Sequence, residues 1–214
     1  MTLIEAENIM GDNFIGPAKL NKISHFFNIK NIPDTSIPEI PFSEKILREN
    51  RKEYILILGV PFNKKGKKLT IDNLRLFFSC DPKIKKPCFY NQDWYLEENF
   101  AKNQTLKFKW YLIRKVPLEK SRGKKIEEIT SEFNRKESFP TAILAAFTFF
   151  AYYLLTGKIL WKHDFIWCSD TDKNGDRIYV GRYEDPLGIN KNGFNVHRHL
   201  SINSFYGVAP EIKI

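Results

Sequence analysis

The sequence predicts an α+β domain, in which a strand and several helices precede a run of strands. The segment Glu53–Phe62 contains a run of branched apolar residues that ends at glycine and proline, which is typical of a buried strand. The segment Ser138–Gly157 is mostly apolar over the length of a helix. After Trp161 the apolar residues recur at the shorter spacing of strands. Aromatic residues make up 14% of the 214 residues, so the chain has enough apolar surface for a packed core.

The first part of the chain is expected to be separate from this domain. A short helical pattern covers Ala18–Phe27, and three prolines follow between Pro33 and Pro41. Proline restricts its own backbone and that of the residue before it, so this stretch favours an extended path. We therefore expect a helical arm and a proline-rich linker over residues 1–42, and the α+β domain over residues 43–214.

Two helices are expected after the first strand. The segment TIDNLRLFF can begin with Thr70 or Asp72, because either side chain can accept a hydrogen bond from a free N–H of the first turn. A shorter helix, with the sequence DWYLEENFAK, is expected to be capped by Asp93.

A strand and an exposed helix are expected next. The segment Lys107–Lys115 alternates as a half-buried strand does, with Phe108, Trp110 and Leu112 on its buried face. The polar segment Lys125–Phe133 suits a helix on the surface.

The segment Ser138–Gly157 has two interpretations. It carries no charge over 20 residues, which is the length of a membrane span. However, Pro140 stands where a helix begins, Gly157 stands where one ends, and threonine and tyrosine dilute the apolar run. A buried core helix is therefore favoured, and we expect no insertion into a membrane.

Cysteine usage and the N-terminus indicate the compartment. The spacings of Cys80, Cys88 and Cys168 match neither a zinc site nor a set of disulfides. The first residues show no basic segment followed by an apolar one, as a secretory signal would. We expect a cytoplasmic protein.

Strands are expected from Phe165 onward, over residues 165–169 and 177–183, near Ile189 and Phe194, and over residues 205–212. The loop between the first two raises the question of calcium, since Asp170, Asp172 and Asp176 follow the order of a calcium loop.

An EF-hand would need helices on both sides and a carboxylate at its twelfth position, which is Gly181. The dipeptide Asn174-Gly175 between two strands instead predicts a hairpin with a type I′ turn. We favour the hairpin and expect no cofactor, with a calcium site formed by Asp170, Asp172 and Asp176 as the alternative.

The chain contains no signature of a known catalytic site. It has no G-x-S-x-G, no H-E-x-x-H and no P-loop. Glu211 and Lys213 have the spacing of a nuclease motif, but no aspartate stands where the motif would need one. His197 and His199 would share one face of a strand, and Cys168 or His163 could complete a zinc set. Two histidines without a third fixed ligand are more often surface or hydrogen-bonding residues, so metal binding is not favoured. We expect a protein that is not an enzyme.

The net charge of +9 leaves a second function open. The lysine-rich segments Lys64–Lys68 and Lys83–Lys86 suit either solvated loops or contacts with phosphates. The alternative function is therefore a nucleic-acid-binding or phage-type accessory protein that uses these lysine-rich loops.

The segment 186–210 has an unusual composition. It is rich in Asn, Ser, His, Tyr and Gly, which recognition surfaces use for adaptable polar contacts. Its only residue among Lys, Glu, Gln, Met and Trp is Lys191. We expect ligand-binding side chains in this segment: Asn190, Asn192, Asn195, His197, His199, Ser201, Asn203, Ser204 and Tyr206.

Several motifs over residues 53–214 resemble a group of proteins from candidate-phylum bacteria: WYLIRK, a helix that begins P-T-A and ends LLTGKILW, WCSD, GDRIYVGRYED and YGVAP. The tails of that group resemble the variable (target) proteins of diversity-generating retroelements. In that family, adenine-directed mutagenesis of AAY codons randomises a C-terminal ligand-binding surface.

The resemblance implies a C-type-lectin-like fold, with two main helices, a mostly antiparallel sheet and a C-terminal strand that returns to the N-terminal strand. It also implies that the partner is a protein or another surface ligand.

Overall fold

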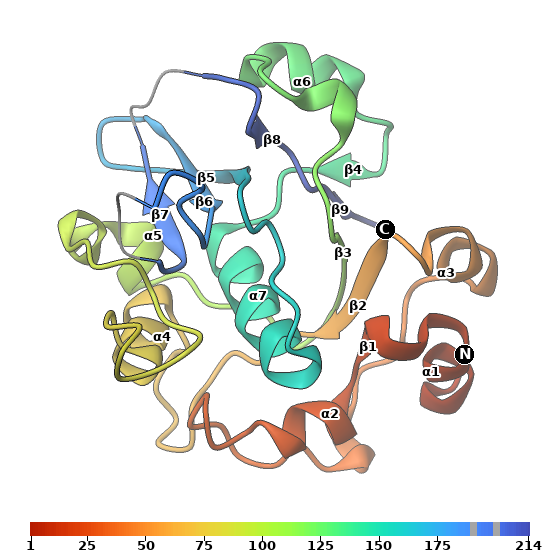
Figure 1. Ribbon diagram of the computed structural model, residues 1–214. Coiled ribbons are helices and arrows are strands. Elements are labelled where there is room, and N and C mark those ends of the chain that lie inside the picture. The colour runs from red at the N-terminus through yellow and green to blue at the C-terminus, as the bar shows by residue number, and fades with distance from the viewer. Residues whose placement is uncertain (189–191, 199–201) are drawn as a thin grey trace.

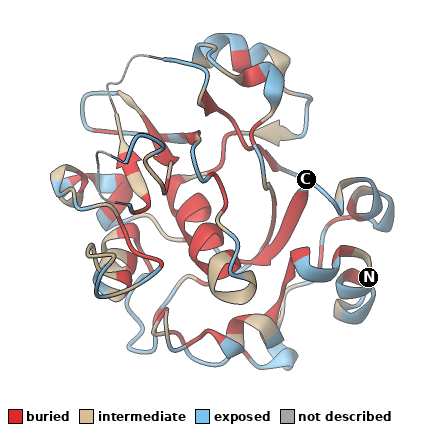
Figure 2. Cartoon of the chain, in the orientation of Figure 1, coloured by how far each residue is buried: buried red, intermediate tan, exposed pale blue. Residues whose placement is uncertain are grey.

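The computed structural model describes residues 1–188, 192–198 and 202–214, and it shows an α+β fold with two sheets (Figure 1). The predicted ligand contacts Asn190, His199 and Ser201, and the strand predicted near Ile189, lie outside the described residues. The first sheet has the order β1-β2-β3-β9-β4 and the second has the order β7-β6-β5-β8. Helix α7 lies at the centre, and burial is concentrated in it and in the strands beside it (Figure 2).

The first sheet is built on the pairing of its two longest strands. Strands β2 and β3 are antiparallel, with Leu58 opposite Trp110 at one end. Its five strands are β1 (Phe14–Ile15), β2 (Tyr54–Leu58), β3 (Trp110–Arg114), β4 (Glu137–Ser138) and β9 (Glu211–Ile212).

The second sheet is formed by the C-terminal part of the chain. Strands β5 and β6 form an antiparallel hairpin, β7 pairs with β6, and β8 lies parallel to β5. Its strands are β5 (Phe165–Thr171), β6 (Arg177–Gly181), β7 (Asn195–His197) and β8 (Tyr206–Gly207).

The helices mostly surround the sheets. The α-helices of the described residues are α1 (Leu3–Met10), α2 (Pro17–Lys22), α3 (Glu44–Asn50), α4 (Ile71–Phe78), α5 (Asn99–Lys102), α6 (Ile126–Glu132) and α7 (Ala142–Thr156). Short 3-10 turns cover Gly11–Asn13, Asp34–Ser36, Trp94–Glu97 and Glu119–Ser121.

Helix α7 is the core helix that the sequence predicts. The side chain of Thr141 accepts a hydrogen bond from the N–H of Leu144, and Gly157 ends the helix with the positive φ that glycine tolerates best. All residues from Ala142 to Tyr152 are buried. Within the described residues, no helix has the length and apolar character needed to cross a membrane.

The N-terminal segment packs on the main core and is not a detached arm. Strand β1 runs parallel to β2, and Phe14 stacks on Trp110 with ring centroids 5.3 Å apart. The indole N–H of Trp110 donates to the carbonyl of Pro38 at 2.9 Å, which fixes the proline-rich stretch. A two-residue strand is too short to show an alternating pattern, so the sequence did not reveal it.

The C-terminal strand does not reach the N-terminal strand. Strand β9 pairs with β3 and β4, because β2 already has β1 on one side and β3 on the other. Most strand pairs of the described residues are antiparallel, as expected; the parallel ones are β1 with β2 and β5 with β8.

Two other expectations are corrected. The segment after Asp93 is divided into a 3-10 turn and the short helix α5, and the Asp93 side chain makes no capping hydrogen bond. Instead its carboxylate pairs with Arg75. Phe108 precedes strand β3 and is 38% exposed, whereas Trp110 and Leu112 are buried as predicted.

Candidate ligand-binding surface

Strand β7 lies in the middle of the segment 186–210 and is packed into the core. Val196 lies opposite Val180 in the β6–β7 pair, and both side chains are buried. Phe194 is also buried, with its ring 4.7 Å from that of Phe149 in α7. Phe194 and Val196 therefore belong to the core.

The side chain of Asn195 links strand β7 to the neighbouring segments of the chain. Its side-chain amide donates to the carbonyls of Arg182 at 2.9 Å and Gly193 at 3.2 Å, and its oxygen accepts from Gln92 at 3.3 Å. The side chain is half-buried. We expected a ligand contact at this position, but these bonds give Asn195 a structural role.

The loop before β7 approaches another backbone closely. A side chain at Gly193, where φ is 159°, would place its Cβ 2.4 Å from the backbone nitrogen of Tyr90. Only glycine fits such an approach. Asn192, next to it, is exposed, and its side-chain oxygen accepts from the N–H of Asp185 at 3.4 Å.

His197 is half-buried at the end of β7. Its ring stacks on that of Tyr179 at 5.8 Å, and its Nδ1 lies 3.5 Å from the tyrosine hydroxyl. Its Nδ1 also accepts from the N–H of Arg198 at 2.9 Å, so the ring is held within the scaffold.

Arg198 ties the end of β7 to the β5–β6 hairpin. Its guanidinium pairs with the carboxylate of Asp172, lies 3.6 Å from Glu98 and stacks over Trp94 at 4.4 Å. Burial opposes ionisation of Asp172, but the N–H donors of the turn and the charge of Arg198 outweigh it, so the pKa of Asp172 lies below its usual value.

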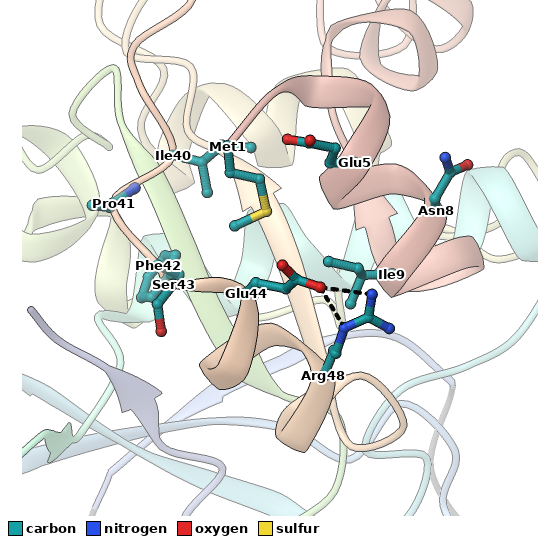
Figure 3. Close-up of a pocket in the computed structure, with 10 residues that line it drawn as sticks. All are labelled: Met1, Glu5, Asn8, Ile9, Ile40, Pro41, Phe42, Ser43, Glu44 and Arg48. Carbon is teal, nitrogen blue, oxygen red and sulfur yellow. Dashed lines mark hydrogen bonds and ion pairs between the residues drawn. The ribbon is translucent and has the colours of Figure 1, made fainter.

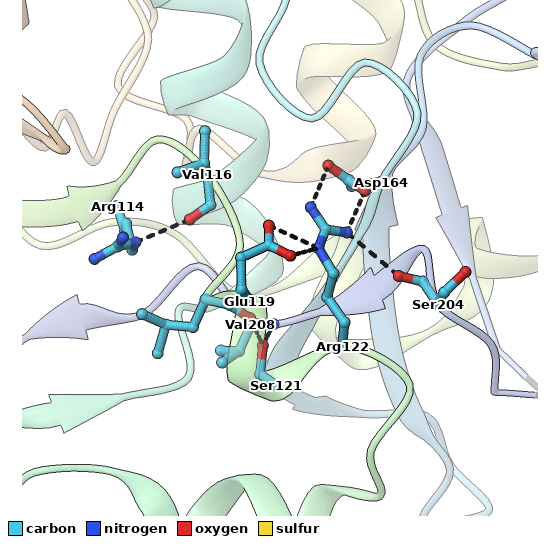
Figure 4. Close-up of polar contacts among 9 residues, drawn as sticks. Arg114, Val116, Glu119, Ser121, Arg122, Asp164, Ser204 and Val208 are labelled. Carbon is cyan, nitrogen blue, oxygen red and sulfur yellow. Dashed lines mark hydrogen bonds and ion pairs between the residues drawn. The ribbon is translucent and has the colours of Figure 1, made fainter.

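A second set of contacts anchors the C-terminal segment on either side of β8 (Figure 4). Arg122 forms an ion pair with Asp164 at 2.6 Å and donates to the carbonyl of Ser204 at 3.3 Å. The hydroxyl of Ser121 accepts from the N–H of Val208 at 3.0 Å. These contacts fix the backbone, while the side chain of Ser204 is exposed.

Asn203 and Tyr206 differ in exposure. Asn203 is exposed, and its side-chain oxygen accepts from the N–H of Phe205 at 3.2 Å. Tyr206 was expected to contact a ligand, but it is only 1% exposed and packs against Phe165 and Trp167. Its strand β8 pairs with the buried strand β5, which turns the ring inward.

The acidic loop is a hairpin turn, as favoured from the sequence. The N–H of Asp172 donates to the carbonyl of Asp176 at 3.0 Å, and that of Gly175 donates to Asp172 at 3.1 Å. Positive φ in this loop is confined to Gly175, so the turn is a type I turn with a glycine bulge, not the expected type I′.

Two of the three carboxylates proposed for calcium, Asp170 and Asp172, have separate structural roles. Asp170 accepts from the N–H of Ala142 at 2.6 Å, at the start of α7, and burial raises its pKa. Asp172 serves the turn and Arg198, as described above. Over residues 1–188, 192–198 and 202–214, no group of three or more His, Cys, Asp or Glu side chains has the arrangement of a metal site.

The sequence did not single out the apolar members of this surface. Leu187 is 74% exposed and Ile202 is 38% exposed. Phe205 is half-buried, and the guanidinium of Arg182 lies over its ring at 4.2 Å. We define the display surface as the exposed side chains of Leu187, Asn192, Ile202, Asn203 and Ser204. They flank β7 in the sequence, and the last three lead into β8 at the other edge of the second sheet.

A hollow lies far from this surface in the chain. It is a groove of about 720 Å³ between α1 and the segment that leads into α3 (Figure 3). Its charged side chains are already engaged, since Glu44 pairs with Arg48 at 2.7 Å and Glu5 caps α1. Nothing in it indicates a catalytic group.

Comparisons with known proteins assign the chain to no family. No protein-family model matches the chain, and neither a curated protein nor a solved structure matches it.

Proposed function

We propose that the protein is a non-enzymatic binding module that recognises a protein or another surface ligand through its display surface. The observation that carries the proposal is the contrast within one segment. Phe194, Val196 and Tyr206 are buried, whereas five polar or aliphatic side chains of the same segment are exposed.

The scaffold beneath these side chains is fixed. Asn195, Arg198 and Arg122 each bind backbone or carboxylate groups of another segment. A surface held in this way loses little conformational entropy when a ligand binds, which favours affinity.

We also propose the class of protein, which is that of the variable proteins of diversity-generating retroelements. The resemblance noted in the sequence is to the variable proteins of diversity-generating retroelements, which carry a randomised surface on a C-type-lectin-like fold. An α+β fold whose C-terminal segment contributes strands to both sheets is in keeping with such a role, because those strands hold the exposed side chains between them on a common scaffold.

Two libraries test the proposal. In the first, the display surface is randomised at Leu187, Asn192, Ile202, Asn203 and Ser204. In the control, Asn195, His197 and Arg198 are randomised instead, because these residues belong to the same segment but hold the scaffold. Each library is displayed on cells, scored for folded protein and selected against a panel of purified proteins.

We expect most clones of the first library to fold and some to bind members of the panel specifically. Most clones of the control library should fail to fold. A first library that loses folding as often as the control, or that folds but yields no specific binder, would contradict the proposal.

A further inference from the structure

A second surface, distant from the display surface in the chain, combines exposed rings with lysines. It is a groove of about 370 Å³ between the segment after α2 and the loop after β2. Phe62 and Phe108 line it, and they are 51% and 38% exposed. Both rings face solvent although most other phenylalanines of the described residues are buried.

The groove lies in a strongly basic part of the chain. The segments that line it, residues 28–36, 60–68 and 105–109, contain seven lysines and one acidic residue, Asp34. All seven lysines are exposed. None of them forms an ion pair with a carboxylate in the part of the chain that the structure describes, so their charges are available to an anionic ligand.

The lysine-rich loop has a defined backbone. Buried Asn63 accepts from the N–H groups of Lys65 and Lys67 at 2.9 and 3.1 Å. The N–H of Lys64 donates to the carbonyl of Asn28 at 2.7 Å, which joins the loop to the opposite wall of the groove. The Thr105 hydroxyl lies within donor distance of two carbonyls at the base of the loop, that of Pro61 at 2.8 Å and that of Leu69 at 2.9 Å.

We infer that this groove binds single-stranded nucleic acid. Exposed aromatic rings stack on unpaired bases, and lysines beside them contact the phosphates. A duplex offers its phosphates but not the faces of its bases, so it would use the lysines alone. The inference concerns a surface other than the display surface, so either assignment can fail without the other.

The first experiment compares two probes at equal length. A fluorescein-labelled oligothymidine of about 15 nucleotides, within the range of a site on one domain, is titrated with the full chain and followed by anisotropy. The same oligonucleotide annealed to its complement is the second probe. We expect the single strand to bind more tightly, and its affinity to fall with salt at a slope of about −0.7 per phosphate contact.

The second experiment uses matched variants. Phe62→Ala and Phe108→Ala should each weaken binding of the single strand by roughly 5- to 100-fold, and Phe62→Tyr, which keeps a ring, should not. The double variant Lys64→Gln/Lys65→Gln should also weaken binding. The control Lys83→Gln/Lys86→Gln removes the same charge from another exposed loop and should have a smaller effect.

Because these side chains are exposed, the variants should keep the melting temperature of the wild type. The inference is overturned if the duplex binds as tightly as the single strand, if Phe62→Ala and Phe62→Tyr bind as well as each other, or if both lysine pairs contribute equally.

Discussion

Arg198 and Asp172 join two parts of the C-terminal region, the end of strand β7 and the turn of the β5–β6 hairpin. The carboxylate of Asp172 is fully buried and the guanidinium of Arg198 is 23% exposed. Glu98, which is also buried, lies on the other side of the guanidinium at 3.6 Å. This pair therefore anchors the end of β7 to the hairpin turn.

Arg198→Ala should destabilise the fold by about 1–3 kcal/mol, because it leaves two buried carboxylates without their cation. The range is reduced for the partial exposure of the arginine. The measurement is unfolding in denaturant. The control is Arg48→Ala, which breaks the exposed pair with Glu44 and should cost less than about 1 kcal/mol. Equal losses in the two variants would show that Arg198 is not an anchor.

The same pair should depend on pH. The folded-state pKa of Asp172 lies below its usual value, so its ionised form stabilises the fold. This contribution is complete above the unfolded pKa of about 3.9 and is lost as the pH falls through the lower folded value. The stability difference between wild type and Arg198→Ala should therefore shrink below about pH 4. A difference that stays constant from pH 6 to pH 2 would contradict this account.

Glu211 should behave in the opposite way. Burial raises its pKa, although Lys213 lies 3.4 Å away, and the folded state therefore favours the protonated acid. Wild-type stability relative to Glu211→Gln should be highest below the unfolded pKa of about 4.3 and should fall as the pH rises through the higher folded value. Unfolding curves of the two proteins between pH 3 and pH 8 measure it. A relative stability that rises with pH would exclude an unfavourable buried charge.

Gly193 and Gly188 both have positive φ, 159° and 65°, but of the two only Gly193 lies against another backbone. Gly188→Ala should cost about 1–2 kcal/mol from backbone conformation. Gly193→Ala should cost at least about 1–3 kcal/mol more, because its Cβ would overlap the backbone at Tyr90. Thermal melts of both variants suffice. Similar losses would mean that the close approach is not rigid.

Replacing the asparagines of the C-terminal segment should change stability by different amounts, according to the role of each side chain. Asn195→Ala removes side-chain bonds to two backbone carbonyls and should cost about 1–3 kcal/mol. Asn192→Ala and Asn203→Ala, at exposed positions, should each change stability by about 0.5 kcal/mol or less. If all three cost the same, the segment is uniform scaffold and has no display surface.

Patterns within one element could be predicted from the sequence, whereas pairings between distant elements could not. Pro140, Thr141 and Gly157 mark the ends of α7 by their own backbone preferences, so that helix was found. The hairpin at Gly175 was found for the same reason, although its turn type was wrong. Strand β1 and the place of β9 depend on which sheet edges other strands leave free, and no local pattern records that.

The candidate site was predicted in the same partial way. Composition pointed to the segment 186–210, but composition does not say which residues face outward. Tyr206 faces inward because β8 pairs with a buried strand, and Asn195 is used by the backbone. Leu187 and Ile202 were missed because exposed aliphatic residues carry no polar signal.

Sequencing the coding DNA for residues 180–214 from many cells of the source population tests the central claim most directly. If the display surface is diversified for binding, amino-acid differences should concentrate at Asn192, Asn203 and Ser204 and arise at adenines of their codons. The buried neighbours Phe194, Val196 and Val208 should stay constant. A segment as uniform as the rest of the gene, or one whose differences fall equally on buried and exposed positions, would contradict the account.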